Sequence, residues 1–284
     1  MASALRTILI LGRCSNLPTV WSNCLAAWVL AGGGPWSAFY WLCGGAACLY
    51  LGGMFLNDAF DAQFDRLHRP ERPIPRGMIH IQTVWALGFG LLGLGWLILA
   101  FLSATTAALA LSLALAILLY NAVHKLMKEG ALVMALCRAL LYLVAASATE
   151  QGVNGLTIWS ALVLGSYVAG LSFLATWESF PSRPPLWPAT LMFPPLFLAF
   201  LINPGSYRWN ALVLGLALCA WTGRNVWLAR WALHHQVRQA VGGLLAGIIL
   251  VDWLAVADQA FQLGPVFIVL FVAALLLQQI TPAS

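Results

Sequence analysis

Long apolar blocks, separated by short polar or glycine- and proline-rich breaks, dominate this sequence. Most blocks run for about 20 residues, the length at which a helix crosses the hydrocarbon core of a bilayer. A membrane β-barrel would instead show short segments in which apolar and polar residues alternate. There are ten such blocks, but the seventh is crowded with prolines and the tenth is short. We therefore expect nine or ten transmembrane helices. The candidate spans are residues 18–32, 36–56, 82–101, 104–123, 131–149, 155–176, 186–203, 209–229, 238–257 and 264–280.

The composition agrees with an all-α, polytopic membrane protein. Hydrophobic residues make up 62% of the chain and charged residues 8%, whereas soluble domains carry roughly 25% charged residues. No soluble domain or long linker interrupts the blocks, so residues 1–284 are expected to form a single transmembrane domain. The formal net charge is +5, but the basic residues lie in short connections rather than along one face. This distribution argues against a nucleic-acid partner and for a lipid bilayer.

The basic residues also predict the orientation of the chain. If the N-terminus is cytoplasmic, 12 of the 14 lysines and arginines fall on the cytoplasmic side, as the positive-inside rule requires. The opposite orientation reverses that ratio. We therefore expect a multi-pass integral membrane protein whose N-terminus and acidic loops are cytoplasmic. The longest cytoplasmic loop runs from Asn57 to about His80.

This loop begins with four polar residues, Asn57, Asp58, Asp61 and Asp65. If the second span continues as a helix through Asp65, a step of about 100° per residue places all four side chains on one face. Three carboxylates on one stripe at a membrane surface repel one another unless they bind a cation or titrate. Mg²⁺ commonly uses one or two carboxylates together with phosphate and water oxygens. The four residues are the predicted magnesium ligands, and the three aspartates are the predicted catalytic groups.

Three arginines, Arg69, Arg72 and Arg76, follow the acidic stripe and are separated by prolines that stop the helix. Guanidinium groups in such a loop can hold phosphate through paired hydrogen bonds, so acid, metal and base would converge on a diphosphate. Alternatively, the aspartates only balance neighbouring arginines at a helix end, although charge balance does not require four polar groups on one stripe. A CDP-alcohol phosphotransferase would need an Asp-Gly-x-x-Ala-Arg core, where this chain has Asp65-Arg66-Leu-His68.

The motif Asn57-Asp58-x-x-Asp61-x-x-x-Asp65, followed by Arg69-Pro70-x-Arg72-Pro73-Ile-Pro75-x-Gly77, resembles the UbiA superfamily of intramembrane prenyltransferases. Beyond these motifs the resemblance covers the first nine spans, mainly in hydropathy and order. It implies a UbiA-like bundle around a central cavity. In that cavity Mg²⁺ would hold a prenyl diphosphate, which ionises and alkylates an aromatic or other lipophilic acceptor.

Carried over by position, the acidic stripe corresponds to the first aspartate motif of the family. Tyr120, with His124 and Lys125 shortly after it, resembles the family's tyrosine followed by a basic pair. The resemblance therefore adds these three residues to Asn57 and the loop arginines as predicted substrate-binding residues.

The chain departs from the family at the second aspartate motif. The end of the sixth span reads Leu171-Ser-Phe-Leu174-Ala-Thr176-Trp177-Glu178-Ser179, so Glu178 is its only carboxylate and is predicted to contact the substrate. In this respect the chain resembles a UbiA-like branch encoded in bacterial Ebo operons, which could tolerate the loss of this motif. The resemblance implies a bacterial inner-membrane protein that handles secondary-metabolite precursors. Two functions stay open: a prenyltransferase, or a non-catalytic protein of the same fold that binds or transports an isoprenoid or metabolite precursor.

Two charged residues lie inside apolar spans, where unpaired charges are costly and usually face a cavity or a partner. Arg138 is predicted either to help hold the diphosphate or to pair with Glu129. Asp252 is expected to form a buried pair or to be protonated. The glycine pairs Gly44-Gly45 and Gly52-Gly53 predict a close approach between helices.

Overall fold

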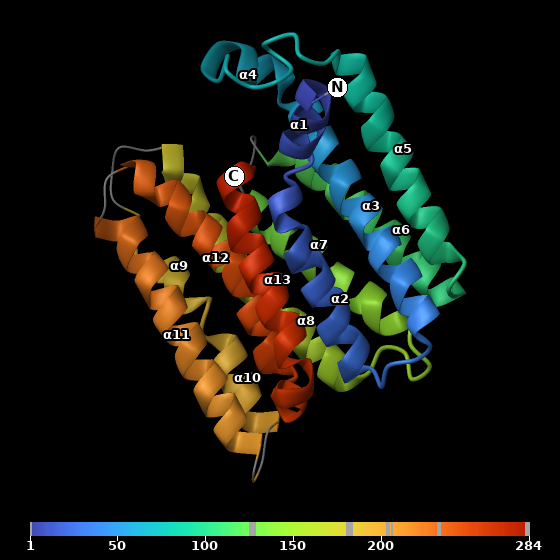
Figure 1. Ribbon diagram of the computed structural model, residues 1–284, viewed down its shortest axis with the longest axis vertical. Coiled ribbons are helices and arrows are strands. Elements are labelled where there is room, and N and C mark those ends of the chain that lie inside the picture. The colour runs from blue at the N-terminus through green and yellow to red at the C-terminus, as the bar shows by residue number, and fades with distance from the viewer. Residues whose placement is uncertain are drawn as a thin grey trace.

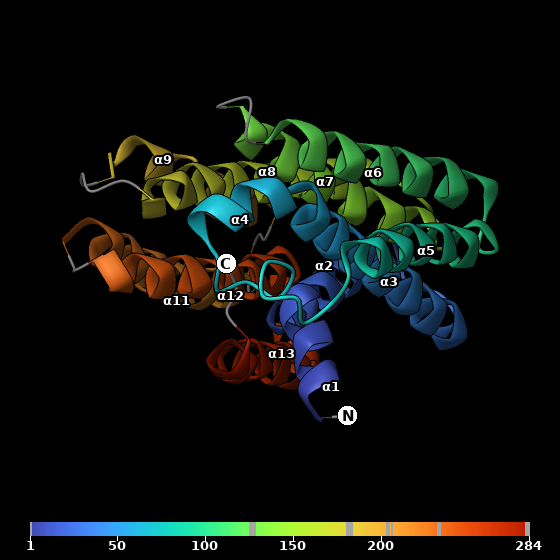
Figure 2. The same ribbon diagram turned by 90° about the horizontal axis from the view of Figure 1, so that it is seen from above.

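The computed structural model describes residues 2–124, 129–179, 184–202, 205, 207–231 and 234–281. The regular structure of these residues is helical, which confirms the expected all-α class. The helices form one elongated bundle, seen from the side in Figure 1 and from above in Figure 2. They are α1 (Ala2–Leu11), α2 (Leu17–Leu30), α3 (Trp36–Phe60), α4 (Ala62–His68), α5 (Ile81–Ala100), α6 (Ala104–Val123), α7 (Gly130–Ser147), α8 (Gly155–Ala175), α9 (Trp187–Thr190), α10 (Pro194–Ile202), α11 (Tyr207–Trp231), α12 (His234–Ala255) and α13 (Ala260–Ile280).

In the part of the chain that the structure describes, eight helices are long and apolar enough to cross a membrane: α3, α5, α6, α7, α8, α11, α12 and α13. This number is below the expected nine or ten, because two of the expected spans form shorter helices. One is α2, which has 14 residues. It ends before Gly32 and Gly33, whose φ angles of 84° and 72° leave the helical region. The tenth expected span forms a helix of membrane length, α13.

The other short segment is the seventh expected span, which divides into α9 and α10. Proline fits the first turn of a helix, because the amide hydrogens there have no partner within the helix. Pro188 lies in the first turn of α9 and Pro194 begins α10. Proline also disfavours the helical conformation in the residue before it, and the two helices are separated by residues 191–193, the last of which precedes Pro194. The prolines thus replace one long helix by two short ones.

Helices α3 and α5 pack closely along their length, as the glycine pairs predict. A Cβ atom on Gly52 would lie 2.8 Å from the carbonyl oxygen of Gly88 and 2.9 Å from the amide nitrogen of Leu92. A Cβ atom on Gly95 would lie 2.8 Å from the carbonyl oxygen of Gly45. Backbone atoms cannot rotate away from such a clash, so these glycines set the distance between the two helices.

We expect the substitution Gly52→Ala to lower the free energy of unfolding by about 1–3 kcal/mol, because the added methyl group must push α5 away from α3. Gly44→Ala is the matched control, since a Cβ atom there meets nothing within 4 Å. Both variants gain the same helix propensity from alanine. Thermal unfolding in detergent measures the difference, and equal melting temperatures for the two variants would contradict this account of the packing.

Two apolar cores hold the bundle together. The larger includes buried residues of α2, α3, α5 to α8 and α10 to α13. The smaller lies where α1, α3, α4, the loop after α4 and the start of α5 meet, and consists of Leu11, Phe55, Ala59, Ala62, Ile74 and Val84. Figure 1 shows α1 and α4 at the same end of the bundle. The smaller core therefore fixes the N-terminal segment and the 69–80 loop beside the end of α3.

The interior holds a cavity of about 10 Å³ between α7, α8, α10 and α12. This volume suits about one water molecule and is far too small for a prenyl chain. The family resemblance implies a central cavity that is large enough for a substrate, and the cavity described here does not confirm that prediction.

Candidate functional site

The acidic stripe lies where α3 ends and α4 begins. We expected one helix to continue through Asp65, and this expectation is wrong at Asp61. Helix α3 ends at Phe60, and Asp61, with φ −78° and ψ −7°, joins it to α4. The backbone amides of Asp61 and Asp65 nevertheless donate to the carbonyl oxygens of Asn57 and Asp61, at 3.0 and 2.9 Å. The helical phase is thus kept across the joint, and Asn57, Asp58, Asp61 and Asp65 are all buried.

Arg72 brings the loop back onto the stripe. Its Nη1 atom lies 2.9 Å from Asp65 Oδ2 and 3.3 Å from Asp58 Oδ1. The backbone supports this position, because the Arg72 amide donates to the carbonyl oxygen of Arg69 at 3.1 Å. Arg69 is half-buried and Arg76 is exposed. Of the three predicted loop arginines, Arg72 thus contacts the acidic stripe, and the other two flank it in the loop.

Arg13 is a site residue that the sequence did not indicate. It lies between α1 and α2 in the left-handed region, with φ 42°, and Tyr50 Oη donates to its carbonyl oxygen at 3.1 Å. The Arg13 Nη2 atom donates to Asn57 Oδ1 at 3.1 Å and lies 3.7 Å from Asp58 Oδ1. Burial acts to lower the pKa of the Arg13 guanidinium, but the acidic groups around it, Asp58 foremost and then Tyr50, Tyr120 and Asp61, together outweigh burial and raise the pKa. Arg13 therefore stays charged beside the acids.

The end of α6 and the residue that follows it, His124, also contact the acidic stripe. Asn57 Nδ2 donates to Asn121 Oδ1 at 3.1 Å, and Asn121 Nδ2 donates to the carbonyl oxygen of Gly53 at 3.1 Å. The Nε2 atom of His124 lies 3.3 Å from Asp61 Oδ1, and its ring stacks on that of Tyr120 at 5.0 Å between centroids. The predicted Tyr120 and His124 thus lie next to the acidic stripe, together with Asn121, which sequence reasoning missed.

Three predicted site residues lie apart from this arrangement or cannot be placed in it. Lys125 and the side chain of Glu178 lie outside the described residues. Arg138 is buried in α7, where its Nη1 and Nη2 atoms donate to Asn23 Oδ1 at 2.9 Å and Thr19 Oγ1 at 3.0 Å on α2. Glu129, its suggested partner, is exposed at the start of α7. These contacts of Arg138 therefore belong to the interior of the bundle.

The carboxylates offer oxygen ligands of the kind that Mg²⁺ prefers, but in the described part of the chain no three acidic, histidine or cysteine side chains are grouped closely enough to hold a metal by themselves. They are instead drawn onto Arg13, Arg72 and His124. Asp65 Oδ1 is buried without a hydrogen-bond partner among the described groups. This geometry fits a magnesium ion that one or two carboxylates share with phosphate oxygens, rather than an all-protein cage.

Fold and site together define an α-helical membrane protein with a buried acidic site at one end of its bundle. The chain belongs to the UbiA prenyltransferase family, whose model matches residues 15–181, more than half of the sequence. The predicted family and its class, the membrane prenyltransferases, are thereby confirmed.

Curated relatives match shorter stretches. The digeranylgeranylglyceryl phosphate synthase of Metallosphaera sedula is 34% identical over 74 residues, which cover 26% of each chain. The synthase of the same name from Ignicoccus hospitalis is 40% identical over 86 residues, 30% of this chain and 27% of the relative. The matched stretches thus span about a quarter of these relatives. None of these names refers to an Ebo operon, so that branch stays a prediction.

Two solved structures share the fold. A UbiA homologue from Aeropyrum pernix K1, in its apo form, superposes with a TM-score of 0.66 at 16% identity, over 89% of this chain and 98% of that one. A structure from work on digeranylgeranylglyceryl phosphate synthase in membranes has a TM-score of 0.55 at 17% identity, over 100% and 99% of the two chains. The expected UbiA-like bundle is therefore confirmed.

Proposed function

We propose that this protein transfers a prenyl group from a prenyl diphosphate to a lipophilic acceptor within the membrane. The observation that carries the proposal is the buried acidic stripe at the α3–α4 joint, which Arg13, Arg72 and His124 surround. Positive groups and carboxylates side by side can hold a diphosphate directly and through a divalent cation at the same time. Family membership supports this chemistry.

Asn57, Asp58, Asp61 and Asp65 are the residues that would hold Mg²⁺. When bound together with the substrate, Mg²⁺ would neutralise the charge that develops on the departing diphosphate. The carboxylates of this chain would orient the ion, and Asn57, fixed by Arg13 and Asn121, would supply an amide oxygen at the edge of the site.

Arg13 and Arg72 have a second role in the proposal. In the structure both guanidinium groups contact Asp58, and Arg72 also contacts Asp65, which reduces the repulsion between these two carboxylates. A diphosphate offers the same guanidinium groups stronger, bidentate acceptors. As the arginines turn toward phosphate, the carboxylate oxygens become available to the metal. Arg69 and Arg76, which flank Arg72 in the same loop, would add positive charge near the diphosphate. Lys125, which lies outside the described residues, would also bind phosphate in this proposal.

The acceptor is lipophilic in this proposal, without a requirement for an aromatic ring. The curated relatives are named as synthases of digeranylgeranylglyceryl phosphate, a product built on glyceryl phosphate. This name makes a prenylated glyceryl phosphate a candidate acceptor alongside the aromatic compounds expected from the sequence. The bilayer would deliver either kind of acceptor.

A second candidate function rests on residues 171–179, where aspartates are absent. With one of the two acidic motifs lost, the protein would bind or transport an isoprenoid or metabolite precursor without transferring it. The acidic stripe would then bind the diphosphate of an intact ligand.

The two candidates differ in whether diphosphate is released. We expect the purified protein in lipid nanodiscs, given Mg²⁺, labelled prenyl diphosphates and a panel of aromatic and glyceryl phosphate acceptors, to release diphosphate and form a prenylated product. Chelation by EDTA should abolish release, and added Mg²⁺ should restore it, because without the metal the carboxylates repel the negatively charged leaving group. Mg²⁺-dependent binding of a prenyl diphosphate with no release from any donor would favour the non-catalytic candidate.

A further inference from the structure

A second polar group of residues lies inside the bundle, away from the acidic stripe. Asp252 on α12 accepts hydrogen bonds at Oδ2 from Ser22 Oγ at 2.5 Å and from Asn23 Nδ2 at 2.7 Å, both on α2. Asn23 in turn accepts from Arg138 on α7. Asn23 thus links one positive and one negative side chain, and every member of this chain of contacts is buried. The positive charge of Arg138 therefore lies near the carboxyl group of Asp252, with Asn23 between them.

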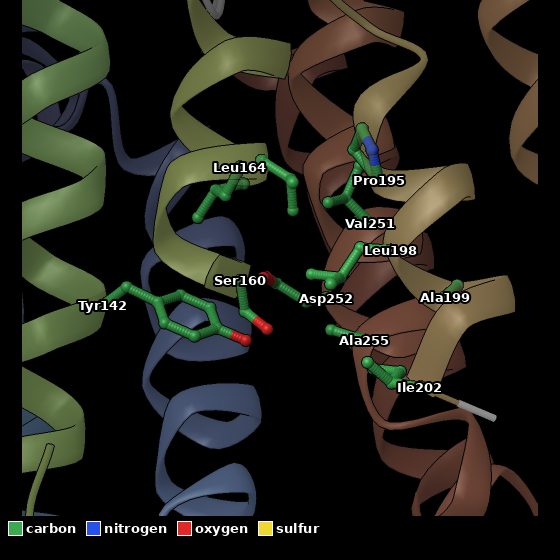
Figure 3. A pocket seen from close by; sticks show the side chains of 11 residues that line it. Tyr142, Ser160, Leu164, Pro195, Leu198, Ala199, Ile202, Val251, Asp252 and Ala255 are labelled. Carbon is green, nitrogen blue, oxygen red and sulfur yellow. The ribbon is translucent and has the colours of Figure 1, made fainter. Parts of the chain in front are cut away.

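Three oxygen atoms beside this network have no hydrogen-bond partner among the described groups: Asp252 Oδ1, Tyr142 Oη and Ser160 Oγ. Their side chains belong to α12, α7 and α8, and each residue is at most 2% exposed. All three line the cavity of about 10 Å³, and Figure 3 shows the two hydroxyl groups and the carboxylate turned toward it. A buried polar oxygen without a hydrogen-bond partner lowers the stability of the folded protein by about 1–3 kcal/mol. One ligand that binds all three oxygens would remove this penalty.

We propose that this cavity binds one water molecule, which connects α7, α8 and α12. The volume is that of about one water, and a buried water typically makes about three hydrogen bonds. The water would donate to Asp252 Oδ1 and Ser160 Oγ and would accept from Tyr142 Oη, so that each of the three oxygens gains a partner.

The charges favour water over a small cation. A sodium ion would also suit a carboxylate and two hydroxyl oxygens, but it would add a second positive charge to a buried group in which Arg138 already offsets Asp252. A neutral ligand leaves that balance intact. The rest of the wall is apolar, including Leu198 and Val251, and cannot stabilise an extra charge.

The direct test is a cryo-EM structure of the full chain in lipid nanodiscs, at a resolution that reveals ordered water, in sodium chloride and again in choline chloride. We expect one density peak within hydrogen-bonding distance of all three oxygens in both salts. A peak that disappears without sodium would overturn the proposal in favour of a cation. An empty cavity, or a direct Tyr142–Asp252 hydrogen bond that closes it, would overturn the proposal altogether.

Thermal unfolding gives an independent readout. We expect Ser160→Ala and Tyr142→Phe each to lower Tm by about 2 to 4 °C. The double variant should lose less than the sum, because both side chains bind the same water. Ser112→Ala is the control, since Ser112 is exposed on α6 and donates to the Ala108 carbonyl oxygen of its own helix, and the Tm of this variant should change by about 1 °C or less. Strictly additive losses would contradict a shared ligand.

Discussion

Replacing Asp61 with asparagine is expected to reduce Mg²⁺-dependent diphosphate release at least about 100-fold, because the loss of one preorganised charge at a reacting group has an effect of this size. Asp61 lies at the centre of the stripe, and its Oδ1 atom faces His124 Nε2 at 3.3 Å. Asparagine has almost the same shape, so the joint between α3 and α4 should form as before. The decrease should appear in kcat/KM, measured with labelled prenyl diphosphate in nanodiscs.

Asp258→Asn is the matched control for this variant. Asp258 is exposed in the turn before α13, so the same chemical change there should leave diphosphate release within about twofold of wild type. If Asp61→Asn retains full turnover while Tm stays unchanged, the acidic stripe is not the reacting site. If Asp61→Asn binds the prenyl diphosphate less tightly than wild type, and neither the variant nor wild type releases diphosphate, the stripe serves the non-catalytic function.

The acidic stripe could be predicted from the sequence because its geometry is local. Asn57, Asp58, Asp61 and Asp65 are spaced for one helical face, and the hydrogen bonds across Asp61 preserve that spacing even though the helix is interrupted there. Arg72 follows after only a few residues, so its return to the stripe was also within reach of sequence reasoning. The break at Asp61 was not, because no proline or glycine marks it.

Other members of the site come from distant parts of the chain. Arg13 and Asn121 reach Asn57 from 44 and 64 residues away, and no periodicity in the sequence connects them. Arg13 could be read only as a topogenic charge, and Asn121 as one polar residue near the end of a span. Packing decides which helices become neighbours, as in the close contact of α3 with α5. Those neighbours cannot be deduced from the pattern of residues in a single sequence.

The interior charges illustrate the same limit. Because an arginine in a span requires a partner, the need for one at Arg138 could be predicted, but not its identity. The nearby Glu129 was a reasonable candidate by position, yet the structure pairs Arg138 with Asn23, which is 115 residues away. Asp252 was expected to form a buried pair or to be protonated. The structure shows that it is buried and accepts hydrogen bonds from Ser22 and Asn23, and both alternatives stay predictions.

The substitution Arg138→Met is expected to lower the free energy of unfolding by about 3–5 kcal/mol. Methionine fills a similar volume, but it leaves the charge of Asp252 without compensation in the interior and Asn23 Oδ1 without a donor, and a buried charge that loses its partner has a penalty of this size. Thermal or denaturant unfolding of the full chain in detergent measures the loss. Arg208→Met, which removes an exposed arginine, should change stability by about 0.5 kcal/mol or less.

A second substitution tests whether the loss comes from the charge of Asp252. In the Arg138→Met background, Asp252→Asn removes the uncompensated charge, so the double variant should be more stable than Arg138→Met alone, with a coupling energy of about 0.5–3 kcal/mol. Purely additive effects would show that the two residues do not interact through Asn23. The folded fraction of Arg138→Met should keep the wild-type KM for prenyl diphosphate, because Arg138 donates its hydrogen bonds to Asn23 and Thr19 on α2. A large rise in KM would instead support the diphosphate-binding role that the sequence left open.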